Sequence, residues 1–280
     1  MKDIFWFIKQ SIILDIRLLV ISEWSILKKI HFVLMKYFLI VKHAFKKFTL
    51  GADFCWFNKK KIYYNTKFGL AGYQRLLCTH QNLINLAGIA KATTVIDIGA
   101  NVGFFTMLSR DLFPESKIFA CEPVPRIFQC LKNNFENDKN TQVFEIAISD
   151  FDGTAKMNFD EHHSSVSQIT NSGNLNIIVK RLDDFVKENN INRIDLLKID
   201  TKTFEAHVVR GGQNSLKITK YLFIEVSMEK DNKNYSISSL LKQLSTDNYN
   251  FQLVCFRNFD DVSEGTMSVM DALFVNKMLI

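Results

Sequence analysis

The sequence has few of the residues that break or link secondary structure: its 280 residues include 3 prolines and 11 glycines. A linker-rich or repeat-built chain is therefore excluded. With 47% hydrophobic and 23% charged residues, the chain is globular and not disordered. The five cysteines are an odd number, and none is spaced as C-x-x-C. This usage predicts free thiols in a reducing, cytoplasmic compartment and provides no zinc site.

Most of the chain lacks a net positive charge. The first 50 residues hold nine Lys or Arg and three Asp or Glu, a net charge of +6. The whole chain has 35 basic and 29 acidic residues, which is also +6, so residues 51–280 are neutral. A nucleic-acid-binding face usually needs a basic stripe. We therefore expect no nucleic-acid partner.

Long uncharged hydrophobic runs are also missing. Residues 1–50 are rich in Ile, Leu and Phe without proline or glycine, which predicts a basic, apolar extension of long helices. A spanning helix needs about 20 nearly uncharged residues, and charges interrupt every such window. No small-residue cleavage site marks a secretory signal. One interpretation is a helical cap packed on the rest of the chain or on a second subunit. The other is a peripheral membrane anchor, with Trp6, Trp24 and lysines that reach anionic lipid.

Residues 51–280 form the second unit, with a helical lead-in over 51–92 and a core over 93–280. In the core, short β-branched runs alternate with stretches of helical spacing. The expected strands are 93–98, 117–121, 142–148, 194–199, 221–226, 251–256 and 268–275, and the expected helices are 102–111, 124–137, 182–190, 203–210 and 237–244.

Repeated strand–helix units predict an α/β fold: a Rossmann-like, doubly wound, mostly parallel seven-stranded sheet with helices on both faces. The link over 257–266 is too short for a helical crossover, so we expect the last strand to run antiparallel. The polar segment 150–181 has two short β runs, and we expect a hairpin-like insertion there.

The first core strand ends in Asp97-Ile98-Gly99-Ala100-Asn101-Val102-Gly103, at the edge where doubly wound sheets bind ligands. Glycines at 99 and 103 let the backbone turn tightly and approach a ligand. The dinucleotide fingerprint G-x-G-x-x-G is absent because Asn101 and Phe104 occupy its later glycine positions, and no Walker-type lysine follows. Glu122 ends the second strand, where it can accept hydrogen bonds from two ribose hydroxyls. This pattern favours S-adenosylmethionine over NAD or a nucleoside triphosphate.

Residues 93–227 resemble the FkbM-type methyltransferase family. The matching pieces are Val95–Gly103, Ala120-Cys121-Glu122-Pro123, Ala147-Ile148-Ser149, Arg181-Leu182-Asp183-Asp184, Leu196-Leu197-Lys198-Ile199-Asp200, Phe204-Glu205 and Phe223-Ile224-Glu225. The resemblance implies a class I methyltransferase fold and transfer of a methyl group from S-adenosylmethionine to a hydroxyl of a sugar, glycan or other small molecule. The cofactor-binding residues that it implies are Asp97, Gly99, Ala100, Asn101 and Gly103 on the methionine side, Glu122 at the ribose and Ala147 near the adenine.

The chain departs from the family after the fourth strand. The family usually has Lys-Ile-Asp-Val-Glu-Gly there, whereas this chain has Lys198-Ile199-Asp200-Thr201-Lys202-Thr203. A base thus replaces an acid close to the expected substrate. An alternative therefore stays open, in which a non-catalytic or substrate-diverged relative keeps the fold and the cofactor pocket. An RNA methyltransferase is disfavoured by the neutral body and by the missing Asn-Pro-Pro motif.

Methyl transfer to a hydroxyl depends on in-line alignment and on removal of the hydroxyl proton. Asp200, after the fourth strand, is the leading catalytic candidate, although it also suits a helix N-cap. His162 and His163, in the polar insertion, are further candidates because histidine transfers protons near neutral pH; the alternative is a solvated loop. The substrate-side candidates are Lys202, Glu205 and Glu225. The acidic and histidine run 160–163 lacks a recognised ligand spacing, so we expect no metal.

Overall fold

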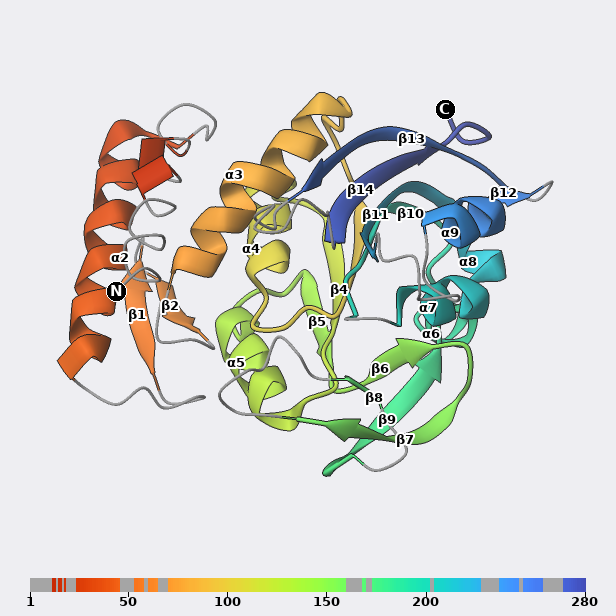
Figure 1. Ribbon diagram of the computed structural model, residues 1–280, viewed down its shortest axis with the longest axis horizontal. Coiled ribbons are helices and arrows are strands. Elements are labelled where there is room, and N and C mark those ends of the chain that lie inside the picture. The colour runs from red at the N-terminus through yellow and green to blue at the C-terminus, as the bar shows by residue number, and fades with distance from the viewer. Residues whose placement is uncertain are drawn as a thin grey trace.

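The computed structural model describes residues 12–13, 15–16, 18, 24–45, 53–57, 60–64, 70–159, 168–169, 173–201, 204–227, 237–246, 249–258 and 269–280 (Figure 1). Its centre is a sheet of order β12-β13-β14-β11-β10-β3-β4-β5. The strands are β3 Thr94–Ile98, β4 Lys117–Cys121, β5 Thr141–Phe144, β10 Ile194–Ile199, β11 Thr219–Ser227, β12 Ser245–Thr246, β13 Tyr249–Asn258 and β14 Val269–Asn276.

Strand directions in this sheet confirm the predicted fold class. The strands from β5 to β11 are mutually parallel, and β14 is antiparallel to both of its neighbours. The two-residue β12 pairs with β13, which leaves seven main strands. From β3 the chain moves outward to β4 and β5 and then returns to β10 on the other side of β3. The strand order therefore reverses at β3, which is where such sheets bind ligands.

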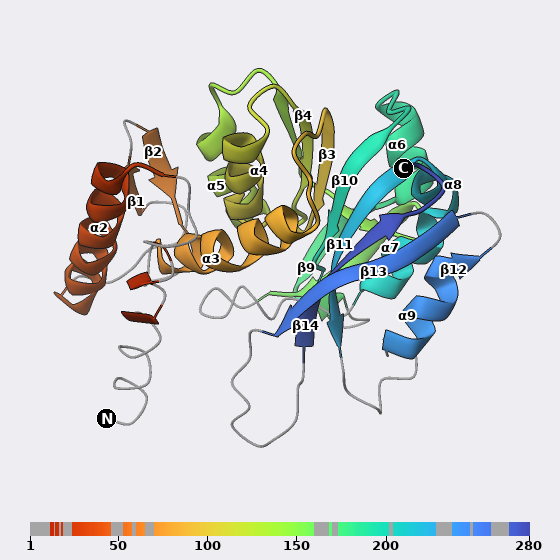
Figure 2. The same ribbon diagram turned by 90° about the horizontal axis from the view of Figure 1, so that it is seen from above.

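Helices cover both faces of the sheet (Figure 2). One face is covered by α3 Ala71–Leu86, α4 Phe104–Leu112 and α5 Pro125–Phe135, and the other by α6 Leu182–Glu188, α7 Glu205–Gly211, α8 Gln213–Lys217 and α9 Ile237–Leu244. Successive strand residues alternate between the two cores: Val95 and Leu196 join the first, Ile96 and Leu197 the second. This double burial is why the central strands read as continuous apolar runs.

The predicted third strand, 142–148, was wrong as a single element. The main sheet keeps β5, which ends at Phe144, and the chain then enters a second sheet as β6 Ala147–Ser149. This four-stranded sheet has the order β6-β9-β7-β8, with β7 Gly153–Asn158, β8 Gln168–Ile169 and β9 Leu175–Arg181. The antiparallel pair β7–β9 is the predicted hairpin-like insertion. The apolar run continues across the break because Ile148 is buried in the second core.

The lead-in 51–92 is not wholly helical, contrary to our expectation. Before α3, a short antiparallel hairpin pairs β1 Phe54–Phe57 with β2 Lys60–Tyr63. Alternation explains the difference, because Cys55 and Phe57, two positions apart, are buried while Phe54, next to Cys55, is only partly covered. Alternate burial is the period of a strand and not of a helix.

The N-terminal extension contributes helix α2 Ile26–Phe45, which packs on the first core through Phe32 and Leu39. Lysines of α2 turn inward: Lys28 pairs with Asp111 (3.6 Å), Lys36 with Asp15, and Lys42 with Asp53 (3.3 Å). The outward side is apolar and carries Ile26, Leu27, Ile30, Leu34, Phe38 and Val41. These three lysines therefore do not flank the apolar side as the membrane-anchor interpretation requires. Among the described helices, none combines the length and the apolar character that crossing a bilayer requires.

Candidate functional site

The turn after β3 adopts the left-handed backbone that its sequence predicts. Gly99, Asn101 and Gly103 have φ of 73°, 53° and 90°. The N–H groups of Gly99 and Ala100 donate to the Cys121 carbonyl at 3.1 and 2.9 Å, which pins the turn to the end of β4. A Cβ on Gly99 would lie 1.9 Å from the Asp200 carbonyl oxygen. Glycine is therefore required at 99 both by φ and by the close approach of the backbone after β10.

A buried ion pair supports this turn from below. The Asp97 carboxylate is wholly buried; it accepts a hydrogen bond from Thr106 Oγ1 (2.7 Å) and lies 3.0 Å from Lys198 Nζ. Lys198 Nζ also donates to the Gly99 carbonyl oxygen at 2.8 Å and lies 3.7 Å from an Asp200 carboxylate oxygen. We expected Asp97 to line the methionine side of the cofactor. The structure instead places it beneath the turn, on which it acts through Lys198.

Glu122 lies at the carboxyl end of β4, as predicted, with 5% of its surface exposed. Its two carboxylate oxygens accept the N–H groups of Asn101 and Val124, each at 3.0 Å. Burial raises the pKa of Glu122 to about 7, and the backbone hydrogen bonds oppose that rise. The carboxylate thus fixes the backbone at Asn101, and a carboxylate has further lone pairs for ligand hydroxyls.

The raised pKa of Glu122 predicts a pH-dependent stability for the ligand-free protein. The pKa is about 7 in the folded chain and ordinarily 4.5, so the folded state binds more protons between these values. The contribution of Glu122 to the free energy of unfolding should therefore fall by about 3 kcal/mol as the pH rises from about 4.5 to about 7. Chemical denaturation of the wild type and of Glu122→Gln across this range measures the effect. The difference between the two proteins should change with pH, and parallel curves would contradict the assignment.

A cavity of about 200 Å³ opens at the carboxyl ends of β3 and β10. The turn contributes Gly99, Ala100, Asn101 and Val102, and the other walls are Leu76, His80, Phe104, Phe105, Lys198 and Asp200. The residues fit the methionine part of S-adenosylmethionine: backbone at a glycine turn, apolar side chains and a carboxylate meet in one space, and Glu122 stands at the next strand end.

Asp200 belongs to a group of three carboxylates. Oxygen atoms of Asp200, Glu205 and Glu225 all lie within 4.8 Å of one another. Glu205 is buried and accepts hydrogen bonds from the N–H (2.8 Å) and the hydroxyl (3.2 Å) of Thr201. The fold thus brings together three predicted site residues from the ends of two strands and the start of a helix. Such oxygens suit either donor hydroxyls or a hard cation.

Other predicted residues lie elsewhere. Ala147 begins β6 and pairs with Val179 in the second sheet, and it does not line the cavity. Gly103 caps α4, where a Cβ would meet the Phe135 ring at 2.5 Å, so it serves helix packing. The catalytic candidates His162 and His163, together with Lys202 and Thr203, lie outside the described residues.

Sequence reasoning assigned no role to His80, Asp271 or Lys198. Lys198 had a detectable signal, since it is a charged residue, as is Asp195, in a strand whose six residues are all buried and whose other four are apolar. His80 and Asp271 had none, because they are 191 residues apart in the chain and meet only in the fold. All five cysteines are free, as predicted.

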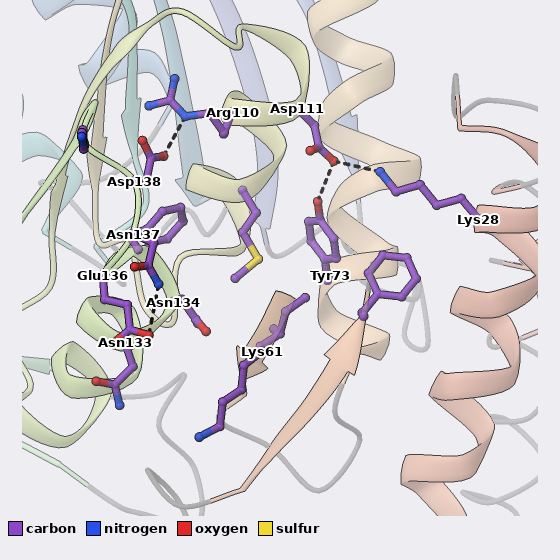
Figure 3. Close-up of a pocket in the computed structure, with 15 residues that line it drawn as sticks. Lys28, Lys61, Tyr73, Arg110, Asp111, Asn133, Asn134, Glu136, Asn137 and Asp138 are labelled. Carbon is purple, nitrogen blue, oxygen red and sulfur yellow. Dashed lines mark hydrogen bonds and ion pairs between the residues drawn. The ribbon is translucent and has the colours of Figure 1, made fainter. Parts of the chain in front are cut away.

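A larger pocket of about 620 Å³ lies apart from this cavity, between the N-terminal elements and helices α4 and α5 (Figure 3). Many of its polar side chains serve the fold. Asp111 bonds Tyr73 (3.3 Å) and pairs with Lys28, and Arg110 bonds Asp138 at 2.8 Å (Figure 3). The pocket lies beside α4 and not at the strand ends, so we place the chemistry in the smaller cavity.

Known proteins resemble the chain over this region. The Methyltransferase FkbM domain model matches residues 97–253. The chain is 28% identical over 142 residues to Methyltransferase 1 of Beauveria bassiana, covering 42% of this chain and 57% of that protein. It is 29% identical over 172 residues to 2-O-methyltransferase NoeI of Sinorhizobium fredii, covering 54% and 70%. It is 25% identical over 155 residues to 31-O-demethyl-FK506 methyltransferase FkbM of Streptomyces tacrolimicus, covering 43% and 60%.

Proposed function

Because the chain belongs to the FkbM methyltransferase family, we propose that it transfers a methyl group from S-adenosylmethionine to a hydroxyl of a sugar, glycan or other small molecule. The observation that carries the proposal is the cavity between the glycine turn and Asp200, at the switch point of the sheet. Relatives named as O-methyltransferases, such as NoeI, support an oxygen acceptor.

The residues that line the cavity or stand beside it have different roles in binding. The turn Gly99–Val102 and Glu122 hold the cofactor, and Lys198 fixes the turn through the Gly99 carbonyl. When bound, S-adenosylmethionine supplies a methyl group on a positively charged sulfur. Phe104 and Phe105 exclude water from this space, which strengthens the electrostatic interactions within it.

The three carboxylates Asp200, Glu205 and Glu225 define the acceptor side. Carboxylates accept hydrogen bonds from hydroxyls, and three of them within 4.8 Å disfavour an anionic group. The acceptor that suits this side is therefore a neutral polyol. Asp200 and Glu225 orient the hydroxyl toward the methyl group, and alignment is a large part of the rate.

Asp200→Asn tests this function. We expect kcat/KM with neutral mono- and oligosaccharide acceptors to fall about 100-fold, while thermal unfolding shows that the variant is folded. Asp152→Asn is the control, because Asp152 is half-exposed beside Lys180 in the second sheet. Absence of turnover by the wild type with every neutral glycan would contradict the proposed function. Full turnover by Asp200→Asn would show that Asp200 is not needed for the reaction.

A further inference from the structure

One amide side chain joins the N-terminal hairpin to the turn after β3. Asn134, on α5, accepts a hydrogen bond from the Tyr63 N–H at 2.7 Å and donates one to the Tyr63 carbonyl oxygen at 3.1 Å. Its Nδ2 also donates to the Val102 carbonyl oxygen at 2.7 Å. Tyr63 is the last residue of β2, and Val102 lines the smaller cavity. Asn134 therefore connects a hairpin that lies outside the part matched by the family model, residues 97–253, with the proposed cofactor turn.

The three hydrogen bonds explain why the connecting side chain is an asparagine. The N–H and the C=O of one strand residue point to the same edge of the strand, so the amide meets Tyr63 as a neighbouring strand would. A carboxamide has one acceptor oxygen and two N–H donors. Asn134 uses the oxygen for the Tyr63 N–H and its nitrogen for the two carbonyls. A carboxylate, which only accepts, could not bond either carbonyl.

The bond to Val102 bears directly on the shape of the turn. Val102 is 1% exposed, so water has little access to its carbonyl oxygen. A buried acceptor that loses its donor is costly, and the peptide between Val102 and Gly103 can rotate to relieve that cost. Gly103 already has a φ of 90° and caps α4. Such a rotation would displace the turn from Gly99 to Val102.

Aromatic rings make a second contact between the N-terminal elements and the cavity. The ring centroids of Tyr73, on α3, and Phe104 lie 5.4 Å apart, and Phe104 lines the cavity. Burial raises the pKa of Tyr73, so its hydroxyl stays protonated and donates to Asp111 of α4 at 3.3 Å. Lys28 of α2 pairs with the same carboxylate (Figure 3). The N-terminal helices thus pack on α4, while Asn134 holds the turn that precedes it.

We propose that Asn134 is a positioning residue for the methyl donor, and that the β1–β2 hairpin supports the cofactor site through it. The inference rests on the proposed function, because it takes the turn from Gly99 to Val102 as the donor site. Asn134 does not line the cavity and acts through the Val102 carbonyl. A turn that is fixed before the ligand arrives lowers the cost of ordering on binding. Donor binding and the order of the hairpin are coupled, and each stabilises the other by the same factor.

Asn134→Leu in the full chain tests the inference. We expect the calorimetric affinity for S-adenosylhomocysteine to fall about tenfold, because the variant keeps a side chain of similar size but loses all three hydrogen bonds. Asn133→Leu is the matched control, with an affinity within about twofold of the wild type. Asn133 is also half-buried on α5, and its amide oxygen accepts a hydrogen bond from Gln129 at 2.8 Å. Asn134→Ser is the second variant, since it leaves room for water if the leucine variant does not fold.

Hydrogen exchange provides a readout that a purely structural role would leave unchanged. In the wild type, saturating S-adenosylhomocysteine should slow exchange of the Tyr63 amide, although Tyr63 does not line the cavity. The folded Asn134 variants should show no such slowing at saturating ligand.

Three results would overturn the inference: a wild type that binds the ligand without slowing at Tyr63, undiminished affinity in a folded Asn134 variant, or an equal loss in Asn133→Leu. A wild type that binds neither S-adenosylmethionine nor S-adenosylhomocysteine would instead contradict the proposed function, so the two failures are distinguishable.

Discussion

Replacing Gly99 with alanine is expected to destabilise the protein by at least about 3 kcal/mol and to abolish measurable S-adenosylmethionine binding. Two costs combine at this position. The backbone has a φ of 73°, and the new Cβ would lie 1.9 Å from the Asp200 carbonyl oxygen and 2.9 Å from its carbon. Relief requires the turn or the end of β10 to move, and both are walls of the cavity. Chemical denaturation and calorimetry measure the two losses.

Gly88→Ala is the matched control for this substitution. Gly88 has a φ of 66°, close to that of Gly99, but a Cβ there would meet no atom within 4 Å. Gly88→Ala should therefore lower the free energy of unfolding by about 1 kcal/mol, the cost of a left-handed backbone at alanine, and should bind the cofactor as the wild type does. Equal effects of the two variants would mean that the close approach to Asp200 does not shape the turn.

Lys198→Met is expected to destabilise the protein by about 3–5 kcal/mol, because it leaves a buried carboxylate without its cation. Asp97 is wholly buried and Lys198 is 3% exposed, with 3.0 Å between their charged atoms. The ammonium also bonds the Gly99 carbonyl oxygen, so cofactor affinity should fall with stability. The double variant Lys198→Met, Asp97→Asn should recover part of the lost stability, since it removes the stranded charge.

Lys180→Met makes the same change in an exposed pair. Lys180 lies 2.6 Å from Glu188, and their side chains are 26% and 57% exposed. Exposed pairs contribute at most about 1 kcal/mol, so unfolding should barely shift. If Lys198→Met lowers the free energy of unfolding as little as Lys180→Met does, the buried pair of Lys198 and Asp97 does not support the turn.

The central strands were predictable because burial on both faces leaves a strong signal. The bounds of Lys117–Cys121 and Ile194–Ile199 agree with the sequence prediction, and every residue of the latter strand is buried. The prediction failed where apolar runs cross a boundary. Residues 142–148 are continuous in hydrophobicity, yet two sheets share them, and only pairing partners distinguish β5 from β6.

The sequence also predicted the residues of the candidate site that stand at the ends of strands, but not those whose contacts depend on distant packing. The carboxyl ends of parallel strands meet at one edge, so Asp200 and Glu225 could be placed together, and the acidic group confirms that they meet. The role of Asp97 was predicted less well, because a carboxylate before a glycine turn can face either the ligand or the protein interior. His80 and Asp271 were out of reach, since neither has a local pattern and their contact depends on how α3 packs against the end of β14.

The central claim is that the turn from Gly99 to Val102, with Glu122 beside it, holds the methyl donor. Titration calorimetry of S-adenosylmethionine into the wild type and into Glu122→Ala tests it most directly. We expect one binding site per chain in the wild type and an affinity at least about tenfold weaker in the folded variant, because the variant loses the carboxylate that bonds the Asn101 N–H and fixes the turn. No binding by the wild type, or equal affinity in both proteins, would contradict it.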